Sequence, residues 1–239
     1  MSKSMYSLTN PQKSIWLTEQ FYKGTSIENI TGTVIVSQNV DFDALKKAIN
    51  LFVKNNDSFR LKFTVKDSTV FQYVDLFNEF DIEIVSVQTD KDVKFLERSM
   101  CDKSFNTLDN FLFDFKLFKF ENGFGGFVIN AHHLIADAWT AGLVVNQVMG
   151  YYESLIKNEE ISNEPNPSYI EYINSEKEDL ESEKFKKDKT FWNEIFETVP
   201  EPATIPSIKQ ETKDLNCNAK RKLFTIPKET INLINEFCK

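Results

Sequence analysis

The chain has 239 residues, of which 41% are hydrophobic, and a formal net charge of −8. Its length and apolar content are sufficient for a substantial core in one or two domains. Acidic residues outnumber basic ones 36 to 28, and no clustered basic stripe is present, which argues against nucleic acid or an anionic membrane as a partner.

The cysteines and the start of the chain exclude further classes. Cys101, Cys217 and Cys238 are far apart, and neither they nor the two adjacent histidines have the spacing of a metal site. No apolar segment typical of a signal peptide follows Met1, and no run approaches the ~18 apolar residues of a membrane helix. We therefore expect a soluble, reduced, cytoplasmic protein that binds no metal and no cofactor directly.

The first elements alternate between helix and strand. Thr9-Asn10-Pro11-Gln12 combines a capping residue, a proline in the first turn and a glutamine three positions after the cap, which predicts a helix that runs to about Tyr22. A β-branched run predicts a strand over 30–37, and Asp41 opens an amphipathic helix. The expected core face of that helix comprises Leu45, Ala48, Ile49, Phe52 and Val53.

The next stretch predicts a sheet. Residues 59–65 and 69–74 alternate around a short polar turn and predict a hairpin. We expect these further elements in chain order: a strand over 80–87, a helix over 90–101, a strand over 111–120 and a strand over 125–132. The last two are joined by a tight turn at Glu121-Asn122-Gly123 and should be antiparallel neighbours.

The remainder of the chain is more polar. A helix should follow Asp137 and end near Lys157, and two prolines mark a linker over 158–167. We then expect two charged helices over 168–180 and 182–196, a loop over 200–218, a short strand over 222–226 and a helix over 228–237.

The two histidines of the chain, His132 and His133, are adjacent and lie where an apolar strand gives way to a helix. Neighbouring side chains on a strand point to opposite faces, so the two residues should have different roles. Imidazole titrates near neutrality and can accept a proton from an amine or a hydroxyl. A structural role is the commoner one for a histidine at a strand end, and Asp137 could either orient an imidazole or cap the helix.

The spacing His132-His133-x-x-x-Asp137 resembles the HHxxxDG motif of condensation domains of nonribosomal peptide synthetases, which belong to the wider chloramphenicol acetyltransferase-like superfamily. Other segments carry the same resemblance in chain order. They are Ser7 to Gln12 with Ile15-Trp16 and Glu19-Gln20 (the opening motif), Asn56 to Phe63 (HEALRTRF), Ser104-Phe105-Asn106 through Leu117 (PFDL to PLLR), and Phe191-Trp192. The resemblance spans nearly the whole chain but covers about the first half of a complete domain.

The resemblance implies a role for each residue of the site. His133 would be catalytic, either by receiving a proton from the attacking amine or by positioning that amine and stabilising developing charge. His132 would be structural and would point toward the protein interior, whereas His133 would face a cleft. Asp137 would pair with an arginine, expected at Arg60, in a largely buried ion pair. Ala138 departs from the usual glycine, which would hinder the site if a positive φ or a close approach of the backbone to the substrate were needed there.

The resemblance also implies an architecture. We expect an α/β fold of the α+β type, a two-layer, chloramphenicol acetyltransferase-like lobe with a mixed, largely antiparallel sheet and flanking helices. Residues 1–160 would form the N-terminal condensation lobe, and residues 161–239 would form linker helices and the beginning of a truncated second lobe. In a complete domain a tunnel runs between the two lobes.

The implied function is amide-bond formation between aminoacyl or peptidyl thioesters in nonribosomal peptide synthesis, an acyltransferase reaction of antibiotic and other secondary metabolism. The partners would be carrier protein domains, whose phosphopantetheine arms deliver the substrates, and the C-terminal condensation lobe. We expect this part of the domain to be inactive by itself and able to self-associate through its exposed face. Two alternatives stay open: an acyltransferase acting on an alcohol, and a non-catalytic module that docks carrier proteins.

Overall fold

The computed structural model describes residues 4–36, 38–161, 166–201 and 224–238. Residues 1–198 form one compact unit, and residues 199–239 form another. The second unit contains one described helix, α7 (Lys228–Phe237), which has the predicted bounds. Residues 222 and 223 of the strand expected over 222–226 lie outside the described residues, and residues 224–226 form no strand.

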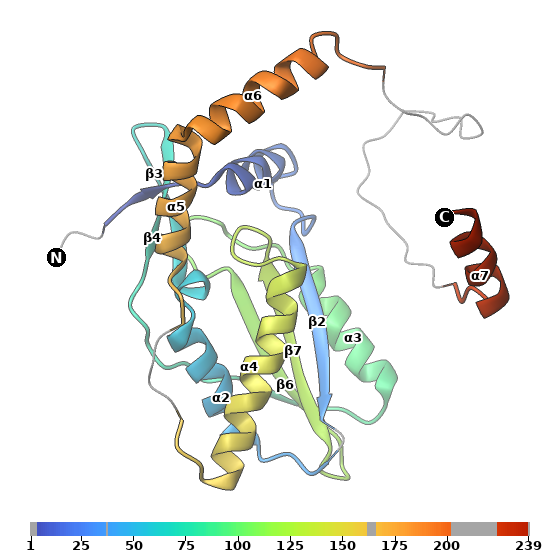
Figure 1. The fold of residues 1–239 in the computed structure, drawn as a ribbon. Coiled ribbons are helices and arrows are strands. Elements are labelled where there is room, and N and C mark those ends of the chain that lie inside the picture. Colours follow the sequence, from blue (N-terminus) through green and yellow to red (C-terminus); the bar gives the residue numbers. More distant parts are fainter. Residues whose placement is uncertain (1–3, 37, 162–165, 202–223, 239) are drawn as a thin grey trace. The chain divides into compact units, whose positions relative to one another are not determined.

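The first unit contains six described α-helices and seven described strands (Figure 1). The helices are α1 (Asn10–Phe21), α2 (Phe42–Asn55), α3 (Asp90–Cys101), α4 (Ala138–Lys157), α5 (Tyr169–Glu181) and α6 (Glu183–Ile195). The strands are β1 (Tyr6–Ser7), β2 (Asn29–Val36), β3 (Leu61–Lys66), β4 (Thr69–Val74), β5 (Ile84–Ser86), β6 (Phe113–Lys119) and β7 (Gly125–His132). A short 3₁₀ helix, η1 (Asp57–Arg60), precedes β3.

The larger sheet carries the histidine motif. Its strand order is β2-β7-β6-β5, with antiparallel pairs except for the parallel pair β5–β6. The predicted antiparallel pairing of β6 and β7 is confirmed. The strand expected over 80–87 is shorter than predicted, because only residues 84–86 pair with β6. The three-stranded sheet β1-β4-β3 contains the predicted hairpin.

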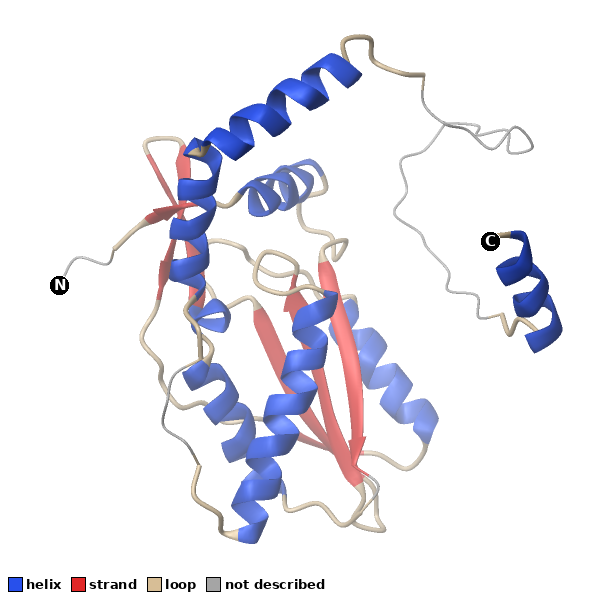
Figure 2. Cartoon of the chain, in the orientation of Figure 1, coloured by secondary structure: helices blue, strands red, loops and turns tan. Residues whose placement is uncertain are grey.

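Helices cover both faces of the larger sheet (Figure 2). The main core is formed by α2, α4 and one face of the sheet, and all five residues expected on the core face of α2 are buried. Helix α3 packs on the opposite face against Phe118 and Val128, which adds a layer to the two that the sequence predicted. The expectation of a mixed, largely antiparallel sheet with flanking helices is confirmed.

Strand alternation determines which residues of β7 meet each helix. Phe127 belongs to the core shared with α2 and α4, whereas Val128 belongs to the cluster with α3. Asn130, two residues further, donates from Nδ2 to the Met100 carbonyl of α3. The same two-residue period places His132 on the α3 face at the end of the strand. None of the described helices is long and apolar enough to cross a membrane.

Candidate functional site

His132, the last residue of β7, is buried, with 2% of its surface exposed. Its Nδ1 accepts a hydrogen bond from the backbone N–H of Leu134 at 3.1 Å. Its Nε2 lies 3.4 Å from Oε2 of Glu19 on α1, and the edge of the Phe105 ring packs near the imidazole. Burial, and secondarily the neighbouring His133, lower the pKa of His132 from its ordinary 6.5 to about 4. His132 is therefore neutral at pH 7, and its contact with Glu19 is a hydrogen bond rather than an ion pair.

His133 begins the turn after β7 and is exposed. Its backbone N–H donates to the carbonyl of Glu28 at 2.8 Å, and the N–H of Ile135 closes the turn onto the carbonyl of His132 at 3.0 Å. The prediction that one histidine is buried and the other accessible is confirmed.

Asp137 is the N-cap of α4 rather than a member of a buried ion pair. Its Oδ1 accepts hydrogen bonds from the backbone N–H and the hydroxyl of Thr140, both at 2.8 Å. The side chain is exposed. These bonds from Thr140 lower the pKa of the Asp137 carboxyl below its ordinary value.

The expected ion pair between Arg60 and Asp137 is wrong. No ion pair joins the two side chains in the described part of the chain, and Arg60 points to the end of α2 instead. Its guanidinium donates to the carbonyls of Val53, at 2.9 Å, and of Lys54, and its Nε donates to the carbonyl of Asp75 at 3.2 Å. The last carbonyls of a helix have no partner within the helix and carry partial negative charge, so they attract a cation.

Ala138 is the first residue of α4, and its φ is not positive. A glycine is therefore not required at this position by the backbone conformation. A close approach of the Ala138 backbone to a substrate stays a prediction.

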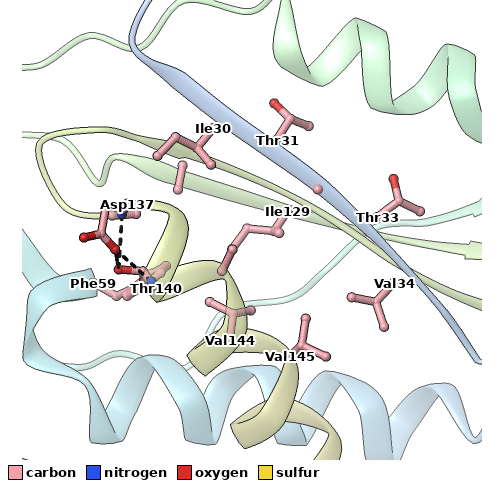
Figure 3. A pocket seen from close by; sticks show the side chains of 14 residues that line it. Ile30, Thr31, Thr33, Val34, Phe59, Ile129, Asp137, Thr140, Val144 and Val145 are labelled. Carbon is pink, nitrogen blue, oxygen red and sulfur yellow. Dashed lines mark hydrogen bonds between the residues drawn. The ribbon is translucent and has the colours of Figure 1, made fainter. Parts of the chain in front are cut away.

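A cavity of about 100 Å³ lies between the sheet and the first turns of α4 (Figure 3). We call it the α4–β2 cavity. It is lined by Ile30, Thr31, Gly32, Thr33, Val34, Phe59, Ile129, Ala131, Ala136, Asp137, Thr140, Ala141, Val144 and Val145. Its walls are mostly apolar, and Ala136 and Asp137 connect it to the histidine motif, although His133 does not line it. A cleft in front of His133 therefore stays a prediction.

Gly32 of β2 lines the α4–β2 cavity at a position with room for a side chain. A Cβ atom added there would meet no other heavy atom within 4 Å. Thr33, the next residue, uses its hydroxyl to bond Glu97 of α3 at 2.7 Å, on the other face of the strand. Neither Gly32 nor the cavity was predicted, because a glycine within a β-branched run is the only signal that the sequence offers.

Helix α1 contacts the motif at two points that the sequence did not predict. Glu19 faces His132, and Nε2 of Gln12 donates to the carbonyl of Leu134 at 3.0 Å. The resemblance included both residues in the opening motif without giving them a role. In the described part of the chain, no group of three or more His, Cys, Asp or Glu side chains could hold a metal ion.

Comparison with known proteins identifies the family. The Condensation domain model matches residues 2–239. The chain belongs to the condensation-domain family. Over its full length this condensation-domain chain is 30% identical to Surfactin synthase subunit 1 and 28% identical to one of the plipastatin synthase subunits, both of Bacillus subtilis (strain 168). The matches cover 7% and 9% of those two proteins.

Solved structures have the same fold. The starter condensation domain of rhizomide synthetase RzmA superimposes with a TM-score of 0.77 and 19% sequence identity, over 84% of this chain and 50% of that chain. The condensation-domain chain thus spans less than a tenth of each of these two synthase subunits and about half of the solved domain.

Proposed function

We propose that this chain supplies the histidine-bearing half of a condensation domain that forms amide bonds in nonribosomal peptide synthesis. The observation that carries the proposal is the difference in burial and hydrogen bonding between the two histidines. His132 is buried and hydrogen-bonded at both ring nitrogens, whereas His133 is exposed on a turn whose backbone is fixed. This arrangement supports a reactive role for the second imidazole only.

In the proposed reaction the acceptor amine attacks the carbonyl carbon of the donor thioester. A C–N bond forms, the C–S bond breaks, and the thiol of the donor's phosphopantetheine arm leaves. The attacking nitrogen loses one proton, and the leaving sulfur gains one. His133 receives the proton from the nitrogen, or it holds the amine in place and stabilises the developing charge. Carrier protein domains would present both thioesters as substrates.

The α4–β2 cavity suggests the kind of donor. One structure of a variant of the RzmA starter condensation domain is a complex with C8-CoA and Leu-SNAC. The cavity in this chain is mostly apolar and begins beside the motif, at Ala136 and Asp137. We therefore extend the proposal to a donor whose acyl group is an apolar chain, with part of that chain in the cavity.

The direct test uses a complete domain that carries this chain. The chain is joined to the second half of the matching condensation domain of Surfactin synthase subunit 1. Donor and acceptor carrier proteins are then loaded, and the amide product is measured by mass spectrometry. We expect His133→Ala to lower the rate by roughly 10²- to 10⁴-fold, the usual contribution of acid–base catalysis. Equal rates with and without the His133 imidazole would refute the proposed role.

A further inference from the structure

Helix α1 buries two of its residues, and both are polar. Gln12 is 2% exposed and Glu19 is 4% exposed, whereas Ile15 and Trp16 are partly buried against the main core and Leu17 and Phe21 are exposed. Burial of a carboxyl or an amide side chain costs free energy unless hydrogen bonds compensate for the lost water. The partners of these two side chains therefore indicate what the helix is for.

Both buried side chains contact the end of β7 and the turn after it, which carries His133. Gln12 and Glu19 are seven residues apart, which is close to two helical turns, so they lie on the same face of α1. Glu19 approaches the His132 ring, and Gln12 reaches the carbonyl of Leu134. One helix face thus contacts the residue before His133 and the residue after it.

The contacts at the two ring nitrogens define the tautomer of His132. Because Nδ1 accepts the Leu134 N–H, the proton of the neutral imidazole is on Nε2, where it can be donated to Glu19. The pKa of Glu19 is itself raised by burial and secondarily by Glu28. Three titratable groups therefore act on this contact: His133 lowers the pKa of His132, Glu28 raises that of Glu19, and Glu19 itself lies against the ring.

The Gln12 contact is part of a larger amide network. Gln12 and Gln72 of β4 exchange reciprocal hydrogen bonds of 2.9 and 2.8 Å, and Gln72 also donates to the Ser7 carbonyl at 3.0 Å. The Oε1 atom of Gln12 further accepts the backbone N–H of Thr9 at 3.0 Å. Gln12 is therefore held from several sides, and the carbonyl of Leu134 is fixed with it.

We propose that Gln12 and Glu19 are positioning residues that clamp the turn carrying His133. Glu19 orients the His132 ring, the ring holds the Leu134 N–H, and Gln12 holds the Leu134 carbonyl. The backbone of His133 is fixed between these points, and its imidazole projects outward from a rigid base. This inference rests on the proposed catalytic role of His133, which the clamp would serve.

Amide hydrogen exchange of the whole chain, measured residue by residue by NMR, tests the clamp without any need for activity. The His133 N–H is bonded to Glu28, so it should be protected in the parent. We expect Glu19→Leu and Gln12→Met each to accelerate its exchange by about tenfold, which corresponds to the loss of one hydrogen bond. The amide of buried Ile49 on α2 serves as an internal reference and should change far less than that of His133.

Three further variants separate a local clamp from general destabilisation. Glu19→Gln keeps an acceptor for the His132 Nε2–H and should retain the parent exchange rate. Gln12→Glu keeps the side-chain shape but loses the donor to Leu134, so it should loosen the turn like Gln12→Met. Gln20→Met changes an exposed amide of the same helix and should have no effect.

The imidazole signals give an independent readout, since the chain contains two histidines. Long-range ¹H–¹⁵N correlation should show His132 with its proton on Nε2 in the parent and in Glu19→Gln. In Glu19→Leu the His132 signal should shift, together with that of His133.

Several results would refute the clamp. The first is a proton on Nδ1 of His132 in the parent. The second is an amide exchange rate of His133 that stays within twofold of the parent rate in folded Glu19→Leu and Gln12→Met. The third is an equal acceleration of amide exchange at His133 and at Ile49. If the exchange results agree with the clamp while His133→Ala stays active in the complete domain, the clamp stands and the proposed catalytic role fails.

Discussion

The carboxylate of Asp137 stabilises the first turn of α4 by accepting two hydrogen bonds from Thr140. We expect Asp137→Ala to lower the free energy of unfolding by about 1 kcal/mol, the usual effect of losing an N-cap, rather than the ~3–5 kcal/mol of a broken buried ion pair. Asp137→Ser keeps a capping oxygen and should recover most of the loss. Urea denaturation of the three proteins at pH 7 measures the difference.

The same substitution predicts a pH dependence. The folded-state pKa of Asp137 is lowered, so the carboxylate stabilises the fold above the unfolded pKa and loses this effect as the pH falls through the folded pKa. The gap between the parent and Asp137→Ala should therefore persist at pH 5 and narrow below about pH 4. A gap that stays constant into acid would show that the charge of Asp137 is unimportant.

His132 also stabilises the fold in its deprotonated form, which for a histidine is the neutral form. Its folded-state pKa of about 4 lies below the ordinary 6.5, so the unfolded chain binds more protons between these values. The stability that depends on neutral His132 is present above about pH 6.5 and is lost as the pH falls through 4, by a few kcal/mol at most. His132→Asn, which cannot titrate, should flatten the fall in unfolding free energy between pH 7 and pH 4.

Glu19 also contributes to the pH dependence of stability, so the pH curve of His132→Asn must be compared with that of the parent. The raised pKa of Glu19 favours the folded state as the pH falls, which offsets part of the His132 effect in the parent. The difference between the two pH curves, measured by urea denaturation, isolates His132. Parallel curves for the parent and His132→Asn would contradict the low pKa of the buried ring.

The elements differ in how far the sequence predicted them. Helix α2 has all five of its expected core residues buried, because a strong 3.6-residue period is a local property. The bounds of α3, β7 and α7 are also as predicted. Strand β5 is short because its extent depends on pairing with β6, a long-range interaction that the apolar run over 80–87 could not reveal.

The candidate site was also predicted only in part, because local patterns are visible in the sequence and long-range contacts are not. Strand alternation predicted that the two histidines point to different sides, and the resemblance predicted that His132 is the one that points inward. The position of the Arg60 guanidinium was not predicted, because the sequence match gives a residue and not its rotamer, and the unpaired carbonyls at the end of α2 are close enough to bind it. The polar face of α1 was also missed, since an apolar pattern is the usual signal for a buried helix face.

Strand β2 provides a prediction about donor binding. Gly32→Leu places a side chain in the α4–β2 cavity at a position where a Cβ meets no heavy atom within 4 Å. The larger residue also suits a strand better than glycine does, so stability should be unchanged or higher. We expect the affinity of the chain for octanoyl-coenzyme A, measured by isothermal titration calorimetry, to fall at least tenfold.

The control for this variant is Gly150→Leu. Gly150 is exposed on α4, and a Cβ there also meets no heavy atom within 4 Å, but it does not line the α4–β2 cavity. This variant should bind the thioester like the parent. Unchanged binding in Gly32→Leu would show that the acyl chain does not enter the cavity.

At the scale of the whole molecule, the C-terminal end of α6 carries a cluster of exposed apolar side chains. Phe191, Trp192, Ile195 and Phe196 are each more than half exposed, and the Trp192 and Phe196 rings stack on each other with centroids 5.7 Å apart. Contiguous apolar surface of this kind is typical of contact sites. Self-association of the isolated chain stays a prediction, which sedimentation at increasing concentration would check.

Amide formation should require more of the domain than this chain provides. The chain matches about half of the solved RzmA domain, and the resemblance places the reaction in a tunnel between two lobes. Catalysis needs the amine and the thioester carbon held within ~3–3.5 Å of each other, and one lobe provides one wall. With loaded donor and acceptor carrier proteins, we expect the isolated chain to give no amide product above the uncatalysed background by mass spectrometry. Turnover that His133→Ala abolishes would show instead that one lobe is sufficient.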